Sequence, residues 1–400
     1  MAACMATRRQ KQTEVPDTTM KVVVAVPGRF HGFDLARVLH GQEVLARFLT
    51  TCPAFVVRRS LSASAPFKTA GWLEVGRWLH RRLHLPGEID PALATAFARF
   101  VAHSLPDGGQ ILVVWSGAAL EAITAARTQG MKVVLERSTP HVAYQTEIRR
   151  RTYKRFDLVW PGTSPRLVAR ELAEYEAVDA IAVPTRFVAE TFMRRGIPKE
   201  RLIVNPYGVD LSRFVPLPLR RDTRPLRILF TGRVGVCKGV PWLLRAFARL
   251  DLKAELHLVG PLDPGMDRVL RHEPMERVVL HGLVPDRQLP AYYTAADIFC
   301  LPSLEEGLPV GVVQAMACGL PVVATTESGA ADILRDGIDG RIVPSGNPPA
   351  LAAALEELAA DPLLRQTIGD RARRAVSTGY DWTAYGRRAT AAYERVLRGA

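Results

Sequence analysis

The chain is poor in cysteine and has no long apolar run. Its five cysteines are scattered over 400 residues without a Cys-x-x-Cys pair, which argues against a disulfide framework or a zinc site and fits a reducing cytoplasm. No stretch approaches the roughly 18 uninterrupted apolar residues that a membrane-spanning helix needs. The start of the chain carries Arg8, Arg9 and Lys11 with no apolar core behind them, so we expect a disordered tail over residues 1–19 and no signal peptide.

Negative charge is also scarce, mainly in the first half. The net charge is +13; residues 1–210 hold 29 Lys and Arg against 19 Asp and Glu, whereas residues 211–400 hold 24 against 21. Such an excess favours an anionic partner, whether nucleic acid, a membrane surface or an anionic substrate, unless the arginines are simply solvated. The sequence has no identifiable nucleic-acid reader with base-stacking aromatics, so we do not expect nucleic acid as a partner.

Both halves of the chain repeat one pattern, in which short β-branched runs alternate with helical stretches. This alternation predicts a doubly wound α/β fold, formed twice, with parallel strands covered on both faces. Strands are expected at Lys21–Val26, Ile111–Ser116, Lys132–Glu136, Leu158–Trp160, Ala180–Val183, Arg227–Thr231, Glu255–Val259, Val278–Leu280, Ile298–Leu301, Pro321–Ala324 and Arg341–Val343. Helices are expected at Phe33–Leu49, Gly117–Thr128, Val240–Leu250, Leu289–Ala295, Gly311–Cys318 and Pro349–Ala359.

We therefore predict two Rossmann-like domains that face each other across a cleft. An N-terminal domain spans 20–212, where the strand ending at Pro206–Gly208 gives way to a proline-rich linker, and a C-terminal domain spans 213–379. The last segment, 380–400, has apolar positions at helical spacing and should cross back to the first domain. Ligands of such sheets bind outside the carboxyl ends of the strands, so the site should lie in the cleft.

The strongest chemical signal is Leu301–Ala324, LPSLEEGLPVGVVQAMACGLPVVA. A buried strand leads into a loop with Glu306 and Gly307, and a helix begins near Val310. The unpaired amides at that helix start can bind an anion, and Gly307 lets the backbone approach a ligand closely. Glu306 would lie beside the anion and accept hydrogen bonds from sugar hydroxyls, while Gln314 can reach the same ligand from the helix. The alternative is an ordinary strand–helix–strand unit with two solvated glutamates.

A second loop, Thr231–Gly239 (TGRVGVCKG), follows the first strand of the second half. Arg233 and Lys238 on a glycine-rich loop suit a diphosphate, because the cations match its charge and glycines such as Gly232 admit its approach to the backbone. The spacing is not that of a Walker loop. Parallel topology should bring this loop to the same edge of the cleft as Glu306.

Together these residues resemble the nucleotide-sugar domain of the retaining glycosyltransferases of family 4, which have the two-domain GT-B fold. The family signature is an acidic residue in an E-G loop, followed after seven residues by a second Glu in EAMACGxPVV; Glu306 fills the first position and Gln314 replaces the second. The family's Arg and Lys for the donor diphosphate correspond to Arg233 and Lys238. The segments YYTAADIFCLPS, AVDAIAVPTRF and PYGVDLSRF are also similar to the family, so the resemblance covers about residues 130–345.

The resemblance also implies site residues in the first domain, on the acceptor side. The segment ERSTPHVAYQTEI resembles a family loop with a His near the donor sugar, which corresponds to His141, although a surface histidine is the alternative. Gly28 and Gly32 lie where relatives carry a glycine-rich loop near the donor phosphates and the acceptor. The implied donor-binding residues are Gly28, Gly232, Gly307, Leu308, Val310 and Gln314. The implied catalytic residues are His141, Arg233, Lys238 and Glu306.

The implied reaction transfers a sugar from a nucleoside diphosphate to a hydroxyl of a glycan or lipid-linked acceptor, with retention of configuration. The chain has no Asp-x-Asp motif, so we expect no metal and no other cofactor; Arg233, Lys238 and the helix amides near Val310 would stabilise the leaving diphosphate. The expected setting is surface polysaccharide or glycolipid synthesis, in the cytoplasm or on the inner face of the membrane.

Two other functions stay open. A glycogen- or sucrose-synthase-like transferase has similar loops, although the N-terminal domain is short for one. A catalytically silent GT-B module would bind an anionic polymer or a protein partner; Gln314 and the lack of a clear glycine pair after the first strand favour it.

One segment of the first half, Trp72–Leu85 (WLEVGRWLHRRLHL), mixes tryptophan and leucine with Arg77, Arg81 and Arg82. Basic charge next to tryptophan suits a helix on an anionic leaflet, and a second basic run lies at Arg149–Arg155. The other interpretation is a helix whose apolar face packs in the core while its arginines are in water.

Overall fold

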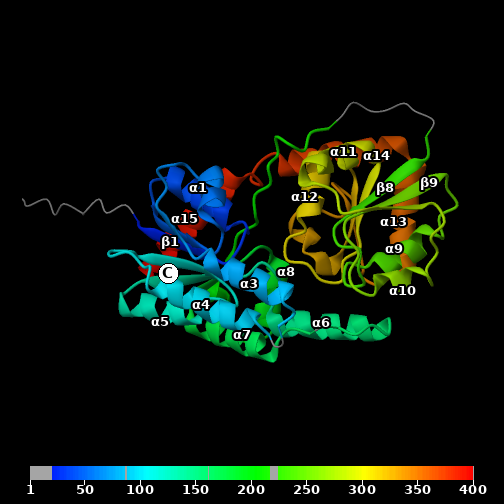
Figure 1. The fold of residues 1–400 in the computed structure, drawn as a ribbon. Helices are drawn as coiled ribbons and strands as arrows, with labels where there is room; N and C mark the ends of the chain where they lie inside the picture. The colour runs from blue at the N-terminus through cyan, green and yellow to red at the C-terminus, as the bar shows by residue number, and fades with distance from the viewer. Residues whose placement is uncertain (1–19, 86–87, 161, 217–223, 400) are drawn as a thin grey trace, which may run out of the picture.

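The protein, described by a computed structural model over residues 20–85, 88–160, 162–216 and 224–399, consists of two α/β units side by side (Figure 1). Each unit is built on its own parallel sheet, with helices on both faces. The expected tail at 1–19 lies outside the described residues, as do residues 217–223 of the expected linker. Within the described ranges, no helix has both the length and the hydropathy to cross a membrane.

The first sheet has seven parallel strands in the order β3-β2-β1-β4-β5-β6-β7. Its central strands β1 and β4 are wholly buried, because helices cover both faces. The strands are β1 (Val22–Val26), β2 (Leu45–Thr50), β3 (Phe67–Thr69), β4 (Ile111–Trp115), β5 (Lys132–Glu136), β6 (Ala180–Val183) and β7 (Leu202–Val204).

Two layers of helices enclose this sheet. In Figure 1, α1 lies with α15 on one side, and α3, α4, α5 and α7 lie on the other. The helices of the first unit are α1 (Gly32–Gly41), α2 (Ala54–Ser60), α3 (Trp72–Arg82), α4 (Asp90–Ala102), α5 (Leu120–Thr128), α6 (Val142–Arg155), α7 (Pro165–Ala177) and α8 (Arg186–Met193).

The second sheet has six parallel strands in the order β10-β9-β8-β11-β12-β13. In Figure 1, α11, α12 and α14 lie on one side of it and α9 and α13 on the other. The strands are β8 (Leu226–Thr231), β9 (Ala254–Val259), β10 (Val278–Gly282), β11 (Ile298–Leu301), β12 (Val322–Thr325) and β13 (Arg341–Val343). The helices are α9 (Val240–Phe247), α10 (Met266–Leu270), α11 (Leu289–Ala295), α12 (Val310–Ala317), α13 (Pro348–Ala360) and α14 (Pro362–Val376).

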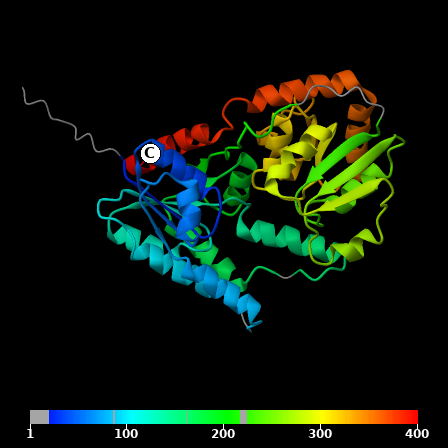
Figure 2. The same ribbon diagram turned by 45° about the horizontal axis from the view of Figure 1, so that its top comes forward.

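The last helix, α15 (Trp382–Arg398), returns to the first unit as predicted. Figure 2 shows this red helix beside the blue N-terminal segment. Arg388 donates to Asn205 Oδ1 at 2.9 Å and to the Pro206 carbonyl at 2.7 Å. A Cβ on Gly386 would lie 2.1 Å from Val38 Cγ1, so a glycine is needed for α15 to pack this closely on α1. The predicted domain boundaries at 212 and 379 stay predictions.

Some expected elements were wrong. The helix expected at Phe33–Leu49 ends at Gly41, and Leu45–Thr50 instead pairs with β1 as strand β2, after a turn in which Glu43 has a φ of 62°. The strand expected at Leu158–Trp160 has no regular structure. Leu158 packs against Gly265 of the second unit, so its apolar character serves a contact between units. The last strand of the first sheet ends at Val204 rather than at Gly208.

Candidate functional site

Two loops of the second unit meet where strands β8 and β11 end. The backbone N–H of Leu304 donates to the carbonyl of Cys237 at 3.0 Å. Gly239 has a φ of 71°, and a Cβ there would lie 1.9 Å from the carbonyl oxygen of Pro302. Only glycine tolerates both the backbone conformation and this approach. The sequence predicted that these loops share one edge of the cleft, and the structure brings them into contact.

An ion pair between Lys238 and Glu306 lies at this meeting point. Lys238 Nζ donates to Glu306 Oε1, and the two side chains are 27% and 20% exposed. Burial works against the positive charge of Lys238, but the contact with Glu306 and the nearby Glu305 outweigh it and raise the pKa of Lys238. The loop therefore holds a permanently charged cation beside a carboxylate, at the carboxyl ends of two parallel strands.

Arg233 lies on the same loop but points elsewhere. Its side chain is 61% exposed and pairs with Asp263 at 3.1 Å. Among the described residues, no contact joins it to the Lys238–Glu306 pair. Gly232 before it has a φ of 137°, and its N–H donates to the Val259 carbonyl at 2.9 Å. For Arg233 to contact a ligand bound at the Lys238–Glu306 pair, its side chain would have to leave Asp263.

Glu305, the neighbour of Glu306, is buried and reaches across to the first unit. Gln145 Nε2 donates to its Oε2 at 3.1 Å, and Arg149 Nε donates to its Oε1 at 2.9 Å. Sequence reasoning missed this contact, because Arg149 was noted only as part of a basic run and its partner lies 156 residues away. The alternative of two solvated glutamates is wrong, since both carboxylates are paired.

Gly307 forms a contact between the two units. A Cβ there would lie 1.7 Å from the carbonyl oxygen of Ser138, so the two backbones touch where any side chain would separate them. Thr185 Oγ1 donates to the Gly307 carbonyl at 3.0 Å. Nearby, Arg186 Nε donates to Asp332 Oδ1 at 2.8 Å. The units are thus in contact directly beside Glu306.

The start of α12 combines a buried anchor with an exposed first turn. Leu308 is buried, and its carbonyl accepts from the Val310 N–H at 2.9 Å. The Val310 side chain is 38% exposed. Within the described part of the chain, no group accepts from the N–H of Gly311. This first turn therefore has the free amide and the positive helix end that favour an anion.

Gln314 is held one turn further along α12. Its Oε1 accepts from the hydroxyl of buried Tyr293 at 2.9 Å, and that hydroxyl lies 2.6 Å from Thr231 Oγ1. Burial raises the pKa of Tyr293, so its hydroxyl stays a donor. The side-chain oxygen of Gln314 is thereby fixed, and its amide nitrogen is left for other partners.

A cavity of about 640 Å³ opens beside Gln314 between the two units. Its size is within the range of small-molecule sites. Its wall combines α1, the segment after β7, the start of α12 and the segment before α15: Asp34, Arg37, Gly208, Val209, Asp210, Leu211, Ser212, Arg213, Phe214, Val310, Gln314, Asp381 and Trp382. Gln314 and Val310 are the predicted site residues that line it.

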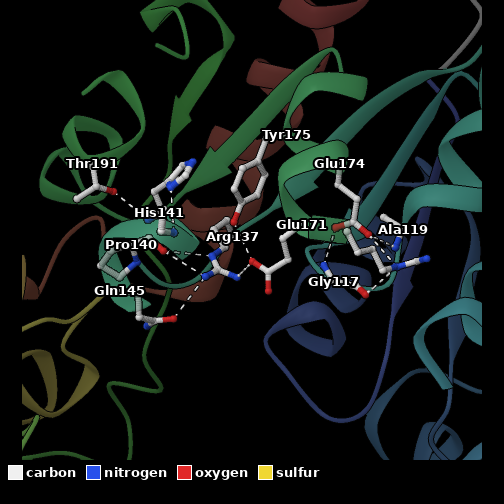
Figure 3. Close-up of polar contacts among 12 residues, drawn as sticks. Gly117, Ala119, Arg137, Pro140, His141, Gln145, Glu171, Glu174, Tyr175 and Thr191 are labelled. Atoms are coloured by element: carbon white, nitrogen blue, oxygen red, sulfur yellow. Dashed lines mark hydrogen bonds and ion pairs between the residues drawn. The ribbon is translucent and has the colours of Figure 1, made fainter. Parts of the chain in front are cut away.

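His141 is buried at the start of α6, and the structure gives it a capping role (Figure 3). Its Nδ1 accepts from the Ala143 N–H at 3.2 Å, and its ring lies 5.1 Å from that of Tyr175 and 5.0 Å from that of Phe192. Burial, with Arg195 nearby, lowers the pKa of His141 to about 4. Among the described residues, no contact joins it to Lys238 or Glu306, and its role at the donor stays a prediction.

Arg137, which the sequence reasoning did not single out, connects the first sheet to this region (Figure 3). It follows β5, pairs with Glu171 and donates to the Pro140 carbonyl at 3.3 Å. It also donates to Gln145 Oε1 at 3.4 Å, and Gln145 in turn contacts Glu305. The chain of polar contacts thus runs from the end of β5 to the loop that carries Glu306.

Two backbone positions that could receive a phosphate in the first unit are already occupied. The Gly28 N–H donates to Thr51 Oγ1 at 2.8 Å. At the start of α5, Glu174 accepts from the N–H groups of Gly117 at 2.6 Å and Ala119 at 2.7 Å (Figure 3). Burial raises the pKa of Glu174 to about 7, although these two donors oppose the shift. Gly28 can contribute shape to a site, but its amide has a partner.

A second acid–base pair lies at the carboxyl edge of the first sheet. His31 Nε2 lies 3.4 Å from Glu136 Oε2, and the Tyr385 hydroxyl donates to Glu136 Oε1 at 3.2 Å. The ring of His31 lies 4.0 Å from that of Tyr207. The sequence signal for His31 was its place in the loop after the first strand, where only the glycines were predicted to be site residues. Among the described residues, no group of three or more His, Cys, Asp or Glu is arranged to hold a metal ion.

Two facing Rossmann-like units with a site at the strand ends define the GT-B fold. The structure of HepE from Anabaena, in complex with UDP and glucose, has this fold; it matches with a TM-score of 0.67 at 17% identity, covering 94% of this chain and 99% of that one. At this identity the likeness shows the fold.

Sequence comparison shows that parts of the chain are similar to known glycosyltransferases. Residues 225–361 match the family model described as Glycosyl transferases group 1. D-inositol 3-phosphate glycosyltransferase of Xylanimonas cellulosilytica is 32% identical over 248 residues, 56% of this chain and 59% of that protein. MMP alpha-(1->4)-mannosyltransferase of Mycolicibacterium hassiacum is 31% identical over 238 residues, 58% of this chain and 56% of that protein. The matches thus span between half and two thirds of these relatives.

Proposed function

We propose that the protein is a retaining glycosyltransferase, which moves a sugar from a nucleoside diphosphate to a hydroxyl of a glycan or lipid-linked acceptor. The observation that carries the proposal is the Lys238–Glu306 pair at the joined ends of β8 and β11. It places a cation that can bind a diphosphate next to a carboxylate that can bind sugar hydroxyls. No nucleophilic carboxylate is needed if the acceptor attacks from the face that the diphosphate leaves.

The donor diphosphate would replace Glu306 as the partner of Lys238. Breaking the bond between the anomeric carbon and the diphosphate oxygen leaves the electron pair on that oxygen, where Lys238, Arg233 and the first turn of α12 would stabilise the charge. The acceptor oxygen forms the new bond to the anomeric carbon, and its proton passes to the departing diphosphate. Glu306, released from Lys238, would hold the sugar by its hydroxyls.

The cavity beside Gln314 is the space we assign to the nucleoside part of the donor. Its volume of about 640 Å³ suits a ligand of that size. The HepE structure was obtained with UDP and glucose, which supports a nucleotide as donor. The relatives named for D-inositol 3-phosphate and for mannosyl transfer support a polyol or glycan hydroxyl as acceptor. We place the reaction in surface polysaccharide or glycolipid synthesis, at the cytoplasmic side of the membrane.

A donor screen tests the proposal. Thermal unfolding would be followed with UDP, GDP, dTDP and ADP, since a bound ligand stabilises the fold by mass action. The sugar forms of the stabilising nucleotide would then be assayed for release of nucleoside diphosphate. We expect one nucleotide to raise Tm, its sugar to be turned over, and Lys238→Ala to lower the turnover strongly. A nucleotide that binds without any turnover would instead favour the silent module.

A further inference from the structure

Helix α3 turns its apolar side away from the protein. Six large apolar residues of α3 and of the segment just after it are 42% to 62% exposed. They are Trp72, Val75, Trp78, Leu79, Leu83 and Leu85. Of the helix residues, Leu73 is the one that is buried. This rules out the interpretation in which the apolar face of α3 packs in the core.

The exposed residues form one face because of their spacing. With 3.6 residues per turn, Trp72, Val75 and Leu79 follow each other at three and four residues, and so lie on one side of the helix. The opposite side holds α3 to the protein by polar contacts as well as by Leu73. Glu74 accepts from Thr51 Oγ1 at 2.6 Å, and Arg77 Nε lies 3.5 Å from Asp90 Oδ1 on α4.

Cations border this apolar face. Arg81 and Arg82 in the last turn are exposed, and no carboxylate among the described residues contacts either of them. The one acidic residue of α3, Glu74, is already neutralised by Arg77.

We infer that α3 docks the protein on an anionic lipid surface. Tryptophan rings suit the boundary between headgroups and acyl chains, and arginines next to them are attracted to lipid phosphates. Arg82 interrupts the apolar face, which suits a layer of headgroups that can rearrange around it. Charge complementarity therefore selects an anionic bilayer as the occupant, rather than a second copy of this strongly basic chain.

The docking surface is connected to the proposed acceptor side. Thr51 links the two, because it donates to Glu74 at the start of α3 and accepts from the Gly28 N–H. Gly28 and Thr51 follow β1 and β2, at the carboxyl edge of the first sheet. A membrane against α3 would thus lie near the edge where an acceptor is expected; this orientation rests on the proposed function, whereas lipid binding does not.

Vesicle sedimentation tests the inference without donor or acceptor. The full chain would be mixed with vesicles of phosphatidylcholine alone or with an equal share of phosphatidylglycerol. We expect binding to the anionic vesicles that weakens as salt is raised, and little binding to the neutral ones. The double variant Arg81→Glu/Arg82→Glu should bind at least about tenfold more weakly, and Trp78→Ser/Leu79→Ser should lose binding as well.

The controls match each change at exposed positions of the second unit. Arg371→Glu/Arg374→Glu on α14 changes the net charge equally, and Leu283→Ser removes an apolar side chain that is 78% exposed. Both should bind like the wild type, and all variants should keep its Tm. Equal binding by the α3 variants and the wild type, or no binding by the wild type, would overturn the inference. Sedimentation velocity showing a dimer that Trp78→Ser/Leu79→Ser disrupts would assign the surface to a second copy instead.

Discussion

Arg149 on α6 donates from Nε to Oε1 of Glu305 at 2.9 Å, and this contact joins the first unit to the loop that carries Glu306. Glu305 has a side chain that is 4% exposed, whereas that of Arg149 is 38% exposed. The charge of Glu305 is therefore buried and depends on Arg149 and Gln145 for compensation. Since Glu306 follows Glu305 directly, this pair also fixes the carboxylate that faces Lys238.

Removing the cation of this pair should destabilise the protein. We expect Arg149→Met to lower the free energy of unfolding by about 1–3 kcal/mol, because Glu305 is left buried with less compensation. Urea unfolding measures the change. The exposed neighbour Arg150 provides the control, since Arg150→Met should be neutral. Adding Glu305→Gln to Arg149→Met should restore part of the loss; equal losses from Arg149→Met and Arg150→Met would show that the pair contributes nothing.

The two cations of the glycine-rich loop should matter more for transfer than for folding. Lys238→Ala and Arg233→Ala should each lower kcat by about 10²–10³-fold, the size found for single contacts to a developing negative charge. Initial rates at saturating donor measure this, and Tm should change little. Lys253→Ala, at an exposed lysine of the same unit, should have normal kcat. Normal turnover in either site variant would mean that the diphosphate binds elsewhere.

Gln314 should influence donor affinity and leave turnover unchanged. Its contact with the ribose would form equally in ground and transition states, so its loss appears in KM. Gln314→Glu should lower the donor KM, because charge-assisted hydrogen bonds are roughly twice as strong as neutral ones, and Tyr293 can still donate to the new carboxylate. Gln314→Ala should raise KM. If Gln314→Glu created transfer where the wild type has none, the proposed enzyme function would fail.

Chelation should leave the reaction unaffected. The proposal assigns the charge of the leaving diphosphate to Lys238, Arg233 and the first turn of α12, so no step depends on a divalent cation. Transfer rates with and without EDTA should therefore agree. Activity lost in EDTA and restored by manganese would contradict this assignment.

His141 should make the protein less stable in acid. Burial first, and then Arg195 and Arg137, lower its pKa from 6.5 to about 4. The unfolded chain takes up a proton near pH 6.5, but the folded chain does so only near pH 4, so stability is lost as the pH falls between these values. At roughly 1.4 kcal/mol per pKa unit the full loss is about 3 kcal/mol. A protonated Nδ1 could also no longer accept from Ala143.

The variant His141→Asn isolates this effect, because asparagine keeps a capping acceptor and does not titrate. Urea unfolding at pH 7.5 and pH 4.5 should show a smaller difference for this variant than for the wild type. His272→Asn, at an exposed histidine, is the matched control and should behave like the wild type. An unchanged pH difference in His141→Asn would mean that other groups cause the acid sensitivity.

The sequence predicted the central strands well because their information is local. β5, β6 and β11 have the expected bounds, since short, nearly continuous apolar runs between turn residues favour strands buried on both faces. β2 was missed because Leu45–Thr50 mixes apolar and polar residues and becomes a strand only by pairing with β1. The same locality made the loops with Lys238 and Glu306 recognisable, because parallel topology alone brings strand ends to one edge.

Contacts between distant segments were decided by the tertiary structure. Nothing near Arg149 in the sequence names Glu305 as its partner, and the two meet only because the units close on each other at Gly307. Nothing near His141 in the sequence shows that its ring packs against Tyr175 and Phe192. In each case the local sequence specifies the chemical group, while long-range packing chooses what that group faces.

Helix α3 shows most clearly what the sequence determined and what the tertiary structure decided. Its periodicity alone determined that Trp72, Val75 and Leu79 share one face of a helix with arginines at its end. An amphipathic pattern has the same period whether its apolar side meets a core or a lipid surface. The direction was decided by the tertiary structure. Leu73, the Glu74–Thr51 hydrogen bond and the Arg77–Asp90 ion pair hold the other side of α3 to the protein, and so the apolar side points outward.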